Sequence, residues 1–168
     1  YVRNTDEAGN LGNTATYSWV TDYTAPTVTF TEYPSERTNE DISTFNFTVD
    51  EAASFACSFD GSEWYECDYP VSFSNLSEAT YLFKVRATDN ANNTGIYTDY
   101  YWTIDRTKPI TTIDSGPTYE NGTYFTSNTA TFSFSNNENA YNNTDECSLD
   151  GGNWNNCNSS VTYNNLSE

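Results

Sequence analysis

The sequence predicts an all-β chain built from tandem β-sandwich repeats. Repetition is the first reason: YSWVTDYTAP at 17–26 returns as YYWTIDRTKP at 100–109, and CSFDGSEWYEC at 57–67 returns as CSLDGGNWNNC at 147–157. A period of roughly 83 to 90 residues gives each repeat enough chain for a hydrophobic core of its own. Composition is the second reason, because 22 Asn, 26 Thr and 17% aromatic residues favour turns and strands.

Alternating segments locate the strands of one complete repeat, which we place at residues 23–105. The first strand is expected at 27–31, directly after a proline suited to a strand start. At 44–49 and 54–59 aromatic residues alternate with polar ones, which indicates half-buried strands. Further strands are expected at 71–74, 80–88 and 96–104. About seven short strands in such a length are typical of an immunoglobulin-like or fibronectin-like sandwich.

The segments on either side resemble parts of the same repeat. Residues 1–22 match the C-terminal strands of a preceding repeat, and residues 106–168 match a repeat that lacks its last two strands. The later copy carries two insertions, about four residues around 119–125 and about three around 139–145, both in expected loops. The chain therefore reads as one complete and two partial immunoglobulin-like repeats.

The four cysteines occur as two local pairs, one at the same place in each repeat. An Asp-Gly turn signal inside each pair brings its two cysteines together across antiparallel strands. A zinc ribbon would need closer spacing. We therefore predict the disulfides Cys57–Cys67 and Cys147–Cys157, which imply an extracellular or cell-surface location.

Four motifs connect the chain with a known group of proteins. W-x-x-D-x-T-x-P, C-S-x-D-G-x-x-W-x-x-C, N-L-S and V-R-x-T-D-x-A-x-N together resemble the Ig-like repeats of large bacterial and archaeal surface proteins. The resemblance covers nearly the whole chain and implies a stalk, adhesin or sheath component without catalytic activity. It names no ligand. The chain departs from that pattern in its high Asn content and in Asn92, where Gly is usual and where Gly9 keeps it in the other copy.

Charge and residue usage exclude several classes of function. With a net charge of −18 and six basic residues, the chain is poorly suited to bind nucleic acid or anionic membranes, and we expect no direct membrane insertion of this segment. It contains no His, so His-based triads and metal sites are absent from these residues. With both cysteine pairs assigned to disulfides and no phosphate loop, we expect no enzymatic activity.

Oxygen-bearing side chains from three segments are expected at one end of the complete repeat. The second and sixth strands of such a sandwich run in the same direction, so the loops that follow them meet the entering linker. The candidate ligands for calcium are Asp22, Asp50, Glu51, Asp89 and Asn93. Plain solvated loops are the alternative. The later copy favours this alternative, because it has Asn136, Asn137 and Glu138 where the complete repeat has Asp50 and Glu51.

Seven N-x-S/T sequons offer glycosylation sites in a secreted chain. They lie at Asn46, Asn75, Asn92, Asn121, Asn142, Asn158 and Asn165. Their number is close to the chance expectation for this composition, so position is the better guide. Asn46 is expected to point outward from its strand, whereas Asn75 and Asn165 are expected in exposed loops.

An apolar groove is the expected result of a repeat without its last two strands. It would be lined by Phe132, Phe134 and Trp154, beside open strand edges. We expect Tyr17 and Trp19 of another copy to fill it, either as successive parts of one giant chain or by non-covalent strand donation. The expected partners are therefore other copies of the chain or neighbouring repeats.

The remaining exposed aromatic residues leave two functions open. Tyr65, Tyr69, Tyr97 and Tyr101 have outward or loop positions and would serve either subunit contact or sugar stacking. Because the repeated motifs indicate a structural protein, subunit contact is the favoured role. The function expected with it is that of an extracellular structural repeat in a stalk, sheath or filament. The alternative function is a carbohydrate-binding adhesin module with glycans as its partners.

Overall fold

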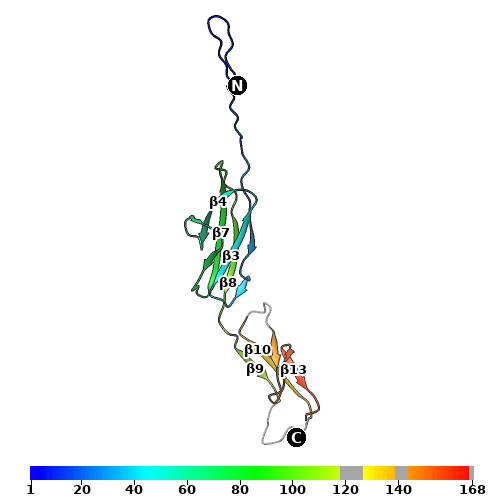
Figure 1. The fold of residues 1–168 in the computed structure, drawn as a ribbon. Helices are drawn as coiled ribbons and strands as arrows, with labels where there is room; N and C mark the ends of the chain where they lie inside the picture. Colours follow the sequence, from blue (N-terminus) through cyan, green and yellow to red (C-terminus); the bar gives the residue numbers. More distant parts are fainter. Residues whose placement is uncertain (118–126, 139–143, 167–168) are drawn as a thin grey trace. The chain divides into compact units, whose positions relative to one another are not determined.

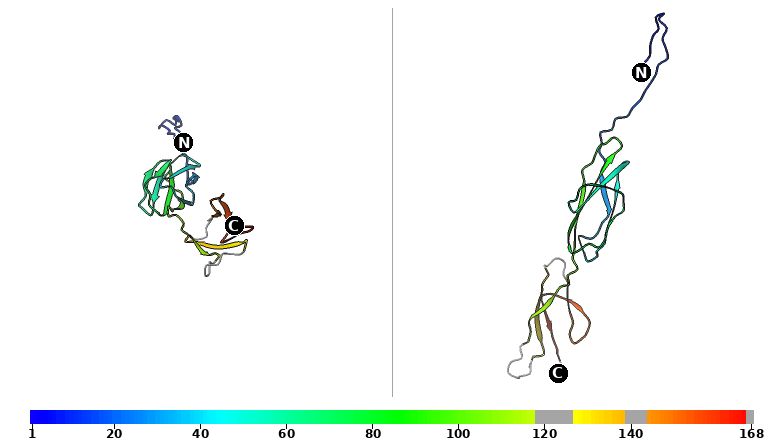
Figure 2. Two further views of the ribbon diagram at one scale, coloured as in Figure 1. Left: turned by 90° about the horizontal axis from the view of Figure 1, so that it is seen from below. Right: turned by 90° about the vertical axis from the view of Figure 1, so that its left-hand side faces the viewer.

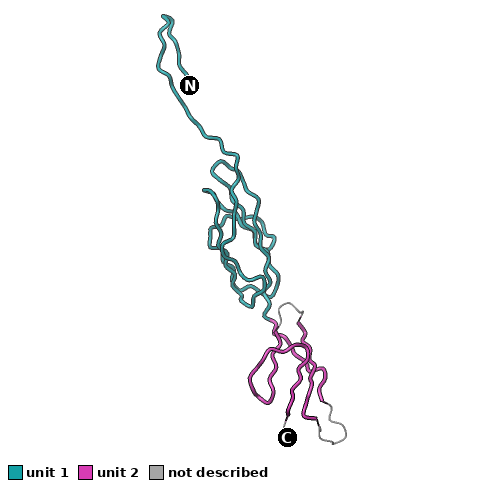
Figure 3. The backbone as a smooth tube through the Cα atoms, turned by 90° about the vertical axis from the view of Figure 1, so that its right-hand side faces the viewer, with its two compact units in different colours: residues 1–106 teal, residues 107–168 magenta. Residues whose placement is uncertain are grey.

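The structure, a computed structural model, describes residues 1–117, 127–138 and 144–166. Within these ranges the chain forms thirteen β-strands and no helix, so the all-β prediction is confirmed. Nor does the described part of the chain contain a helix long and apolar enough to cross a membrane. The chain divides into two compact units, Tyr1–Arg106 (unit 1) and Thr107–Glu168 (unit 2), coloured separately in Figure 3.

Unit 1 holds two sheets that face each other (Figures 1 and 2). The first sheet has the order β1-β3-β6, with β1 at Val28–Glu32, β3 at Ser43–Val49 and β6 at Val71–Phe73. The second has the order β2-β8-β7-β4-β5, with β2 at Arg37–Thr38, β8 at Thr98–Ile104, β7 at Ala79–Asp89, β4 at Ala53–Phe59 and β5 at Tyr65–Cys67. All neighbouring strands are antiparallel except β2 and β8. This arrangement is consistent with the predicted sandwich.

An aromatic core lies between the two sheets of unit 1. Phe45 of β3 is fully buried, and its ring centroid lies 4.6 Å from that of Phe83 and 5.1 Å from that of Trp102. Along β7, side chains at every second position are buried, which is the period of a strand with one face on a core. Both sheets therefore bury their aromatic faces against each other, and this burial stabilises the unit.

The outer face of β7 carries two cations beside one exposed and one half-buried aromatic ring. The Nζ atom of Lys84 lies 4.8 Å from the ring centroid of Tyr97, and the Cζ atom of Arg86 lies 4.2 Å from that of Trp64. Such distances are those of cation–π contacts. The outer face of this sheet thus pairs a basic strand with the aromatic residue of the disulfide-bonded hairpin.

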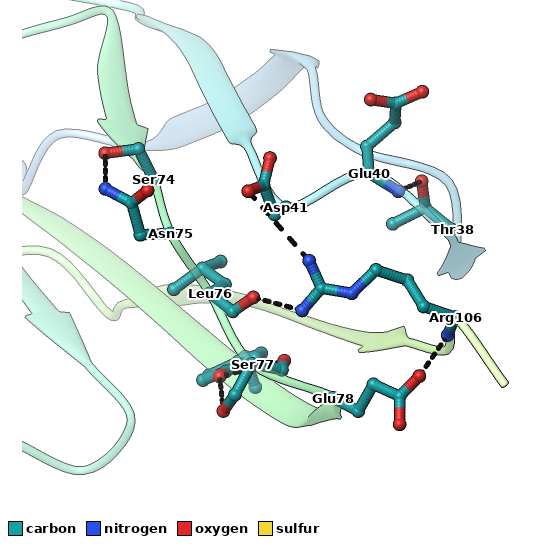
Figure 4. A network of polar contacts seen from close by, with 10 residues as sticks. Thr38, Glu40, Asp41, Ser74, Asn75, Leu76, Ser77, Glu78 and Arg106 are labelled. Atoms are coloured by element: carbon teal, nitrogen blue, oxygen red, sulfur yellow. Dashed lines mark hydrogen bonds and ion pairs between the residues drawn. The ribbon is translucent and has the colours of Figure 1, made fainter.

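A polar network holds the chain where it leaves β8 (Figure 4). Arg106 donates from its guanidinium to the Leu76 carbonyl oxygen at 2.6 Å and from its backbone nitrogen to the Glu78 carboxylate at 2.7 Å. Its guanidinium also lies 3.9 Å from the Asp41 carboxylate. These contacts tie the end of β8 to two loops of the same unit.

Unit 2 repeats part of this architecture. One sheet has the order β13-β10-β9, with β9 at Thr111–Ser115, β10 at Ala130–Asn136 and β13 at Ser160–Tyr163. A second, two-stranded sheet pairs β11 at Asp145–Cys147 with β12 at Asn155–Cys157. By sequence these strands correspond to β1, β3, β6, β4 and β5. Counterparts of β7 and β8 do not occur among the described residues of unit 2.

Both predicted disulfides are present. Cys57 is joined to Cys67 in unit 1, and Cys147 to Cys157 in unit 2, with S–S distances of 2.05 Å and 2.09 Å. Each closes a two-stranded hairpin that turns through an Asp and a Gly with positive φ, the conformation that an Asp-Gly hairpin turn requires.

Candidate functional site

An open groove runs along unit 2. Its volume is about 710 Å³. Its apolar lining consists mainly of Ile113, Phe132, Phe134, Leu149, Trp154, Val161 and Tyr163. The three residues predicted to line a groove are among them, and Trp154 is 68% exposed. Large aromatic side chains on a concave, accessible surface mark a place for another apolar element.

Unit 1 shows what occupies the equivalent space in a complete repeat. There, the ring of Trp102 on β8 is 1% exposed and packs against Phe45, Phe59 and Phe73, with centroids 5.1, 6.2 and 6.4 Å away. By the repeat alignment, the unit 2 counterparts of these three residues are Phe132, Leu149 and Tyr163, which all line the groove. The groove therefore has the residues that receive a β7–β8 pair.

The N-terminal residues form a hairpin (dark blue in Figure 1). Its strands bridge at Val2 with Ala15 and at Thr5 with Leu11, and the Val2 and Ala15 backbones exchange hydrogen bonds of 2.9 and 2.8 Å. All of residues 1–22 are exposed.

The two aromatic residues predicted to enter a groove lie next to each other on this exposed segment. Tyr17 and Trp19 are 82% and 74% exposed, with their rings stacked at a centroid distance of 6.5 Å. Their predicted contact is with a second copy of the chain, so it stays a prediction.

One loop design recurs at the turn of the hairpin and at the turn between β7 and β8. In both turns an Asp carboxylate accepts hydrogen bonds from two backbone N–H groups. Asp6 accepts them from Ala8 and Asn10 at 3.0 and 2.8 Å. Asp89 accepts them from Ala91 and Asn93 at 2.8 Å each. The amide of the following Asn donates to the other carboxylate oxygen at 2.9 and 2.8 Å. Both loops are thus held by their own hydrogen bonds. The predicted metal site did not include this structural role of Asp89. The D-x-A-x-N motif, which occurs at both turns, is the sequence pattern that indicates it.

An acidic cluster forms at one end of unit 1, as predicted. One carboxylate oxygen each of Asp22, Glu51 and Asp89 lie within 4.8 Å of one another. The other two predicted ligands have different roles. The Asp50 carboxylate accepts the Thr27 backbone N–H at 2.8 Å. The Asn93 amide donates to the Asp89 carboxylate at 2.8 Å and to the Asp22 carbonyl oxygen at 3.2 Å.

The pKa values of Glu51 and Asp89 are shifted in opposite directions. Desolvation is the main reason that the pKa of Glu51 is raised, and the negative charges of Asp22, Asp89 and Asp50 raise it further. Burial acts to raise the pKa of Asp89 as well, but the hydrogen bonds from Asn93 and its loop outweigh it and leave that pKa below its ordinary value. Carboxylate oxygens are ligands of the kind that Ca²⁺ takes.

Replacing Glu51 with Gln is expected to flatten the pH dependence of unit 1 stability. With a raised pKa, folded Glu51 holds its proton more tightly than the unfolded chain does. The stability that protonation adds is therefore present at low pH and is lost as pH rises from the ordinary Glu pKa through the raised one. Urea unfolding in chelator between pH 4 and 7 measures this slope, with Glu63→Gln as an exposed control. Parallel slopes in wild type and Glu51→Gln would contradict the prediction.

Of the seven sequons, Asn121 and Asn142 lie outside the described residues. Asn75, Asn92, Asn158 and Asn165 are exposed. Asn46, expected to point outward, is half-buried, and its amide donates to the Glu32 carboxylate of the neighbouring strand. The loop sequons are therefore the more accessible ones.

The four tyrosines considered for sugar stacking do not share one environment. All four are exposed, but their neighbours differ. The ring of Tyr69 packs edge-on against Phe47 and Phe55, with centroids 5.4 and 5.8 Å away, and that of Tyr97 lies beside Trp64. Two of the four rings thus already contact aromatic neighbours of their own unit.

A comparison with protein-family models and one with curated proteins find no match for this chain. The class of protein therefore follows from the structure itself: an all-β, disulfide-bonded, strongly acidic chain of two units.

Proposed function

We propose that this chain is an extracellular structural repeat of a cell-surface stalk, sheath or filament, built from immunoglobulin-like sandwiches. The observation that carries the proposal is the open aromatic groove of unit 2, in a chain that also presents an exposed hairpin of the kind such a groove receives. In this proposal the sandwich of unit 2 is completed by strands of another copy or of a continuing chain.

The chemistry of the chain supports an extracellular setting for this function. Disulfides persist in oxidising compartments, and each unit has one. The net charge of −18 keeps the surface solvated and disfavours non-specific association with nucleic acid. The exposed loop sequons would carry glycans in an organism that attaches them, and those glycans would shield strand edges.

Electron microscopy and glycan binding together test the function. We expect the purified chain to form ordered polymers that do not depend on added sugar, and to bind no glycan on an array. Binding to a glycan that disappears when Tyr65, Tyr69 or Tyr101 is replaced would instead establish the adhesin alternative.

We also propose calcium as the cofactor of the acidic cluster. A cation that binds the folded cluster stabilises unit 1 by mass action and relieves the repulsion among its carboxylates. Millimolar calcium is expected to raise the melting temperature of wild type and to raise that of Glu51→Gln less. A melting temperature that does not change when chelator replaces calcium would remove calcium from the proposal.

A further inference from the structure

The N-terminal hairpin has the same strand register as β7 and β8. Its two backbone bridges recur one repeat later in unit 1, where Val85 pairs with Thr98 and Thr88 bridges Thr94. The hydrogen bonds of its turn recur there as well. The hairpin is therefore folded into the form of a β7–β8 pair, although every one of its residues is exposed.

We propose that the hairpin Tyr1–Asp22 of one chain occupies the unit 2 groove of a second copy, in the register that β7 and β8 use in unit 1. The inference rests on the proposed function and adds its partner, its contact residues and its strand pairing. A hairpin and a groove on different parts of the chain make a head-to-tail contact, which extends into a filament unless rotation closes it into a ring.

Trp19 is the central residue of this contact. It stands where β8 has Trp102, whose ring is surrounded by Phe45, Phe59 and Phe73. Docking in the same register places the Trp19 ring among the counterparts of those residues in the groove, Phe132, Leu149 and Tyr163. Burial of an indole ring that is now 74% exposed supplies a large part of the association free energy.

At one paired position of the proposed contact, the hairpin and the groove both have a polar residue where unit 1 has an apolar one. In unit 1, Ala87 of β7 is fully buried and pairs with Phe55 of β4, a residue packed on the apolar core. The corresponding residues of the joint are Asn4 of the hairpin and Asp145 of the groove.

The groove already contains a polar partner for this pair. Asp145 accepts a hydrogen bond of 3.2 Å from the amide of Asn136, which stands where unit 1 has Val49. A buried carboxylate needs donors, and the Asn4 amide brings two of them to this position. The hairpin and the groove thus match each other where both differ from unit 1, which favours this chain itself as the occupant.

The charges on the outer face match in the same way. In unit 1, Arg86 of β7 pairs with Ala56 of β4 and lies over Trp64. In the docked register, Arg3 is directly opposite Glu146 and is brought to Trp154, which borders the groove and is 68% exposed in the single chain. The hairpin's single basic residue therefore meets an acidic residue and an aromatic ring.

Sedimentation velocity of the full chain over a range of concentrations tests the contact. Wild type is expected to form head-to-tail oligomers, with a blue shift of Trp fluorescence as Trp19 and Trp154 become buried. Trp19→Ala should weaken association by roughly 100-fold or more, whereas Val20→Ala, on the outer face of the same strand, should change it less than about twofold. Because both residues are exposed in the single chain, neither variant should alter thermal unfolding of the two units.

Charge reversal tests the register. Arg3→Glu and Glu146→Arg should each weaken association by roughly fivefold, because like charges then face each other across the strands. The two changes combined in one chain should restore association to within about twofold of wild type. Failure of this rescue would overturn the register.

The remaining outcomes decide the partner. Wild type that stays monomeric at millimolar concentration without the blue shift, or Trp19→Ala that associates as tightly as wild type, would overturn docking of the hairpin. Monomers with blue-shifted fluorescence would show docking within one chain and so overturn the second copy as partner. A wild type that stays monomeric would leave the proposed structural function only in its other form, completion of unit 2 by a continuing chain. The structural function itself fails on glycan binding.

Discussion

Replacing Trp102 with Ala is expected to destabilise unit 1 by about 3–5 kcal/mol, the range for removing a large aromatic residue from a core. The indole ring is 1% exposed and lies 5.1 Å from the centroid of Phe45 and 5.6 Å from that of Tyr81. Its removal deletes contacts to both sheets at once and leaves a cavity that the rigid aromatic neighbours fill poorly. Hydrogen exchange of β3 and β7 amides measures the loss for unit 1 alone.

Two variants control this measurement. Trp102→Phe should cost less, since it keeps an aromatic ring and removes the indole N–H, which finds no hydrogen-bond partner among the described residues. Tyr101→Ala, on the outer face of the same strand, should cost below about 1 kcal/mol. Equal losses for Trp102→Ala and Tyr101→Ala would show that the core is not centred on Trp102.

Alternation of aromatic and polar residues was the part of the fold that could be predicted. The strands expected at 44–49 and 80–88 are β3 and β7, extended by a residue or two. The strand expected at 96–104 begins only at Thr98. Before it, Thr94 forms an isolated bridge with Thr88, and Ile96 is 89% exposed instead of facing the core. A strand with one face on a core has a period of two, and that period is visible in the sequence.

Elements that depend on distant backbone contacts could not be predicted. The two residues of β2 show no alternation; they join the sheet because Thr103 donates to the Glu36 carbonyl oxygen and Asp105 to that of Thr38. Similarly, the contacts of Arg106 with three loop residues follow from where the loops meet. Such pairing leaves no local pattern in the sequence.

The candidate sites likewise have parts that could be predicted from the sequence and parts that could not. The lining of the groove and the proximity of three carboxylates could be predicted, because the repeated motifs indicate which strands and loops lie together. The complementarity of Asn4 with Asp145 and of Arg3 with Glu146 depends on the strand register, which only the β4–β7 pairing of unit 1 provides. Unit 1 thus serves as the structural template for interpreting the hairpin and unit 2.

Replacing both Cys57 and Cys67 with Ser is expected to destabilise unit 1 by about 3 kcal/mol, because the cross-link no longer restricts the unfolded chain over a separation of 10 residues. The loss should be somewhat larger than this entropic contribution, since Cys57 is fully buried and a hydroxyl would take its place in the core. Urea unfolding with and without reductant measures it: the reductant should lower the stability of wild type and leave unit 1 of the double variant unchanged. Equal stability of wild type and variant would mean that the hairpin of β4 and β5 is closed by its strand pairing alone, and would weaken the argument that the protein works in an oxidising, extracellular setting.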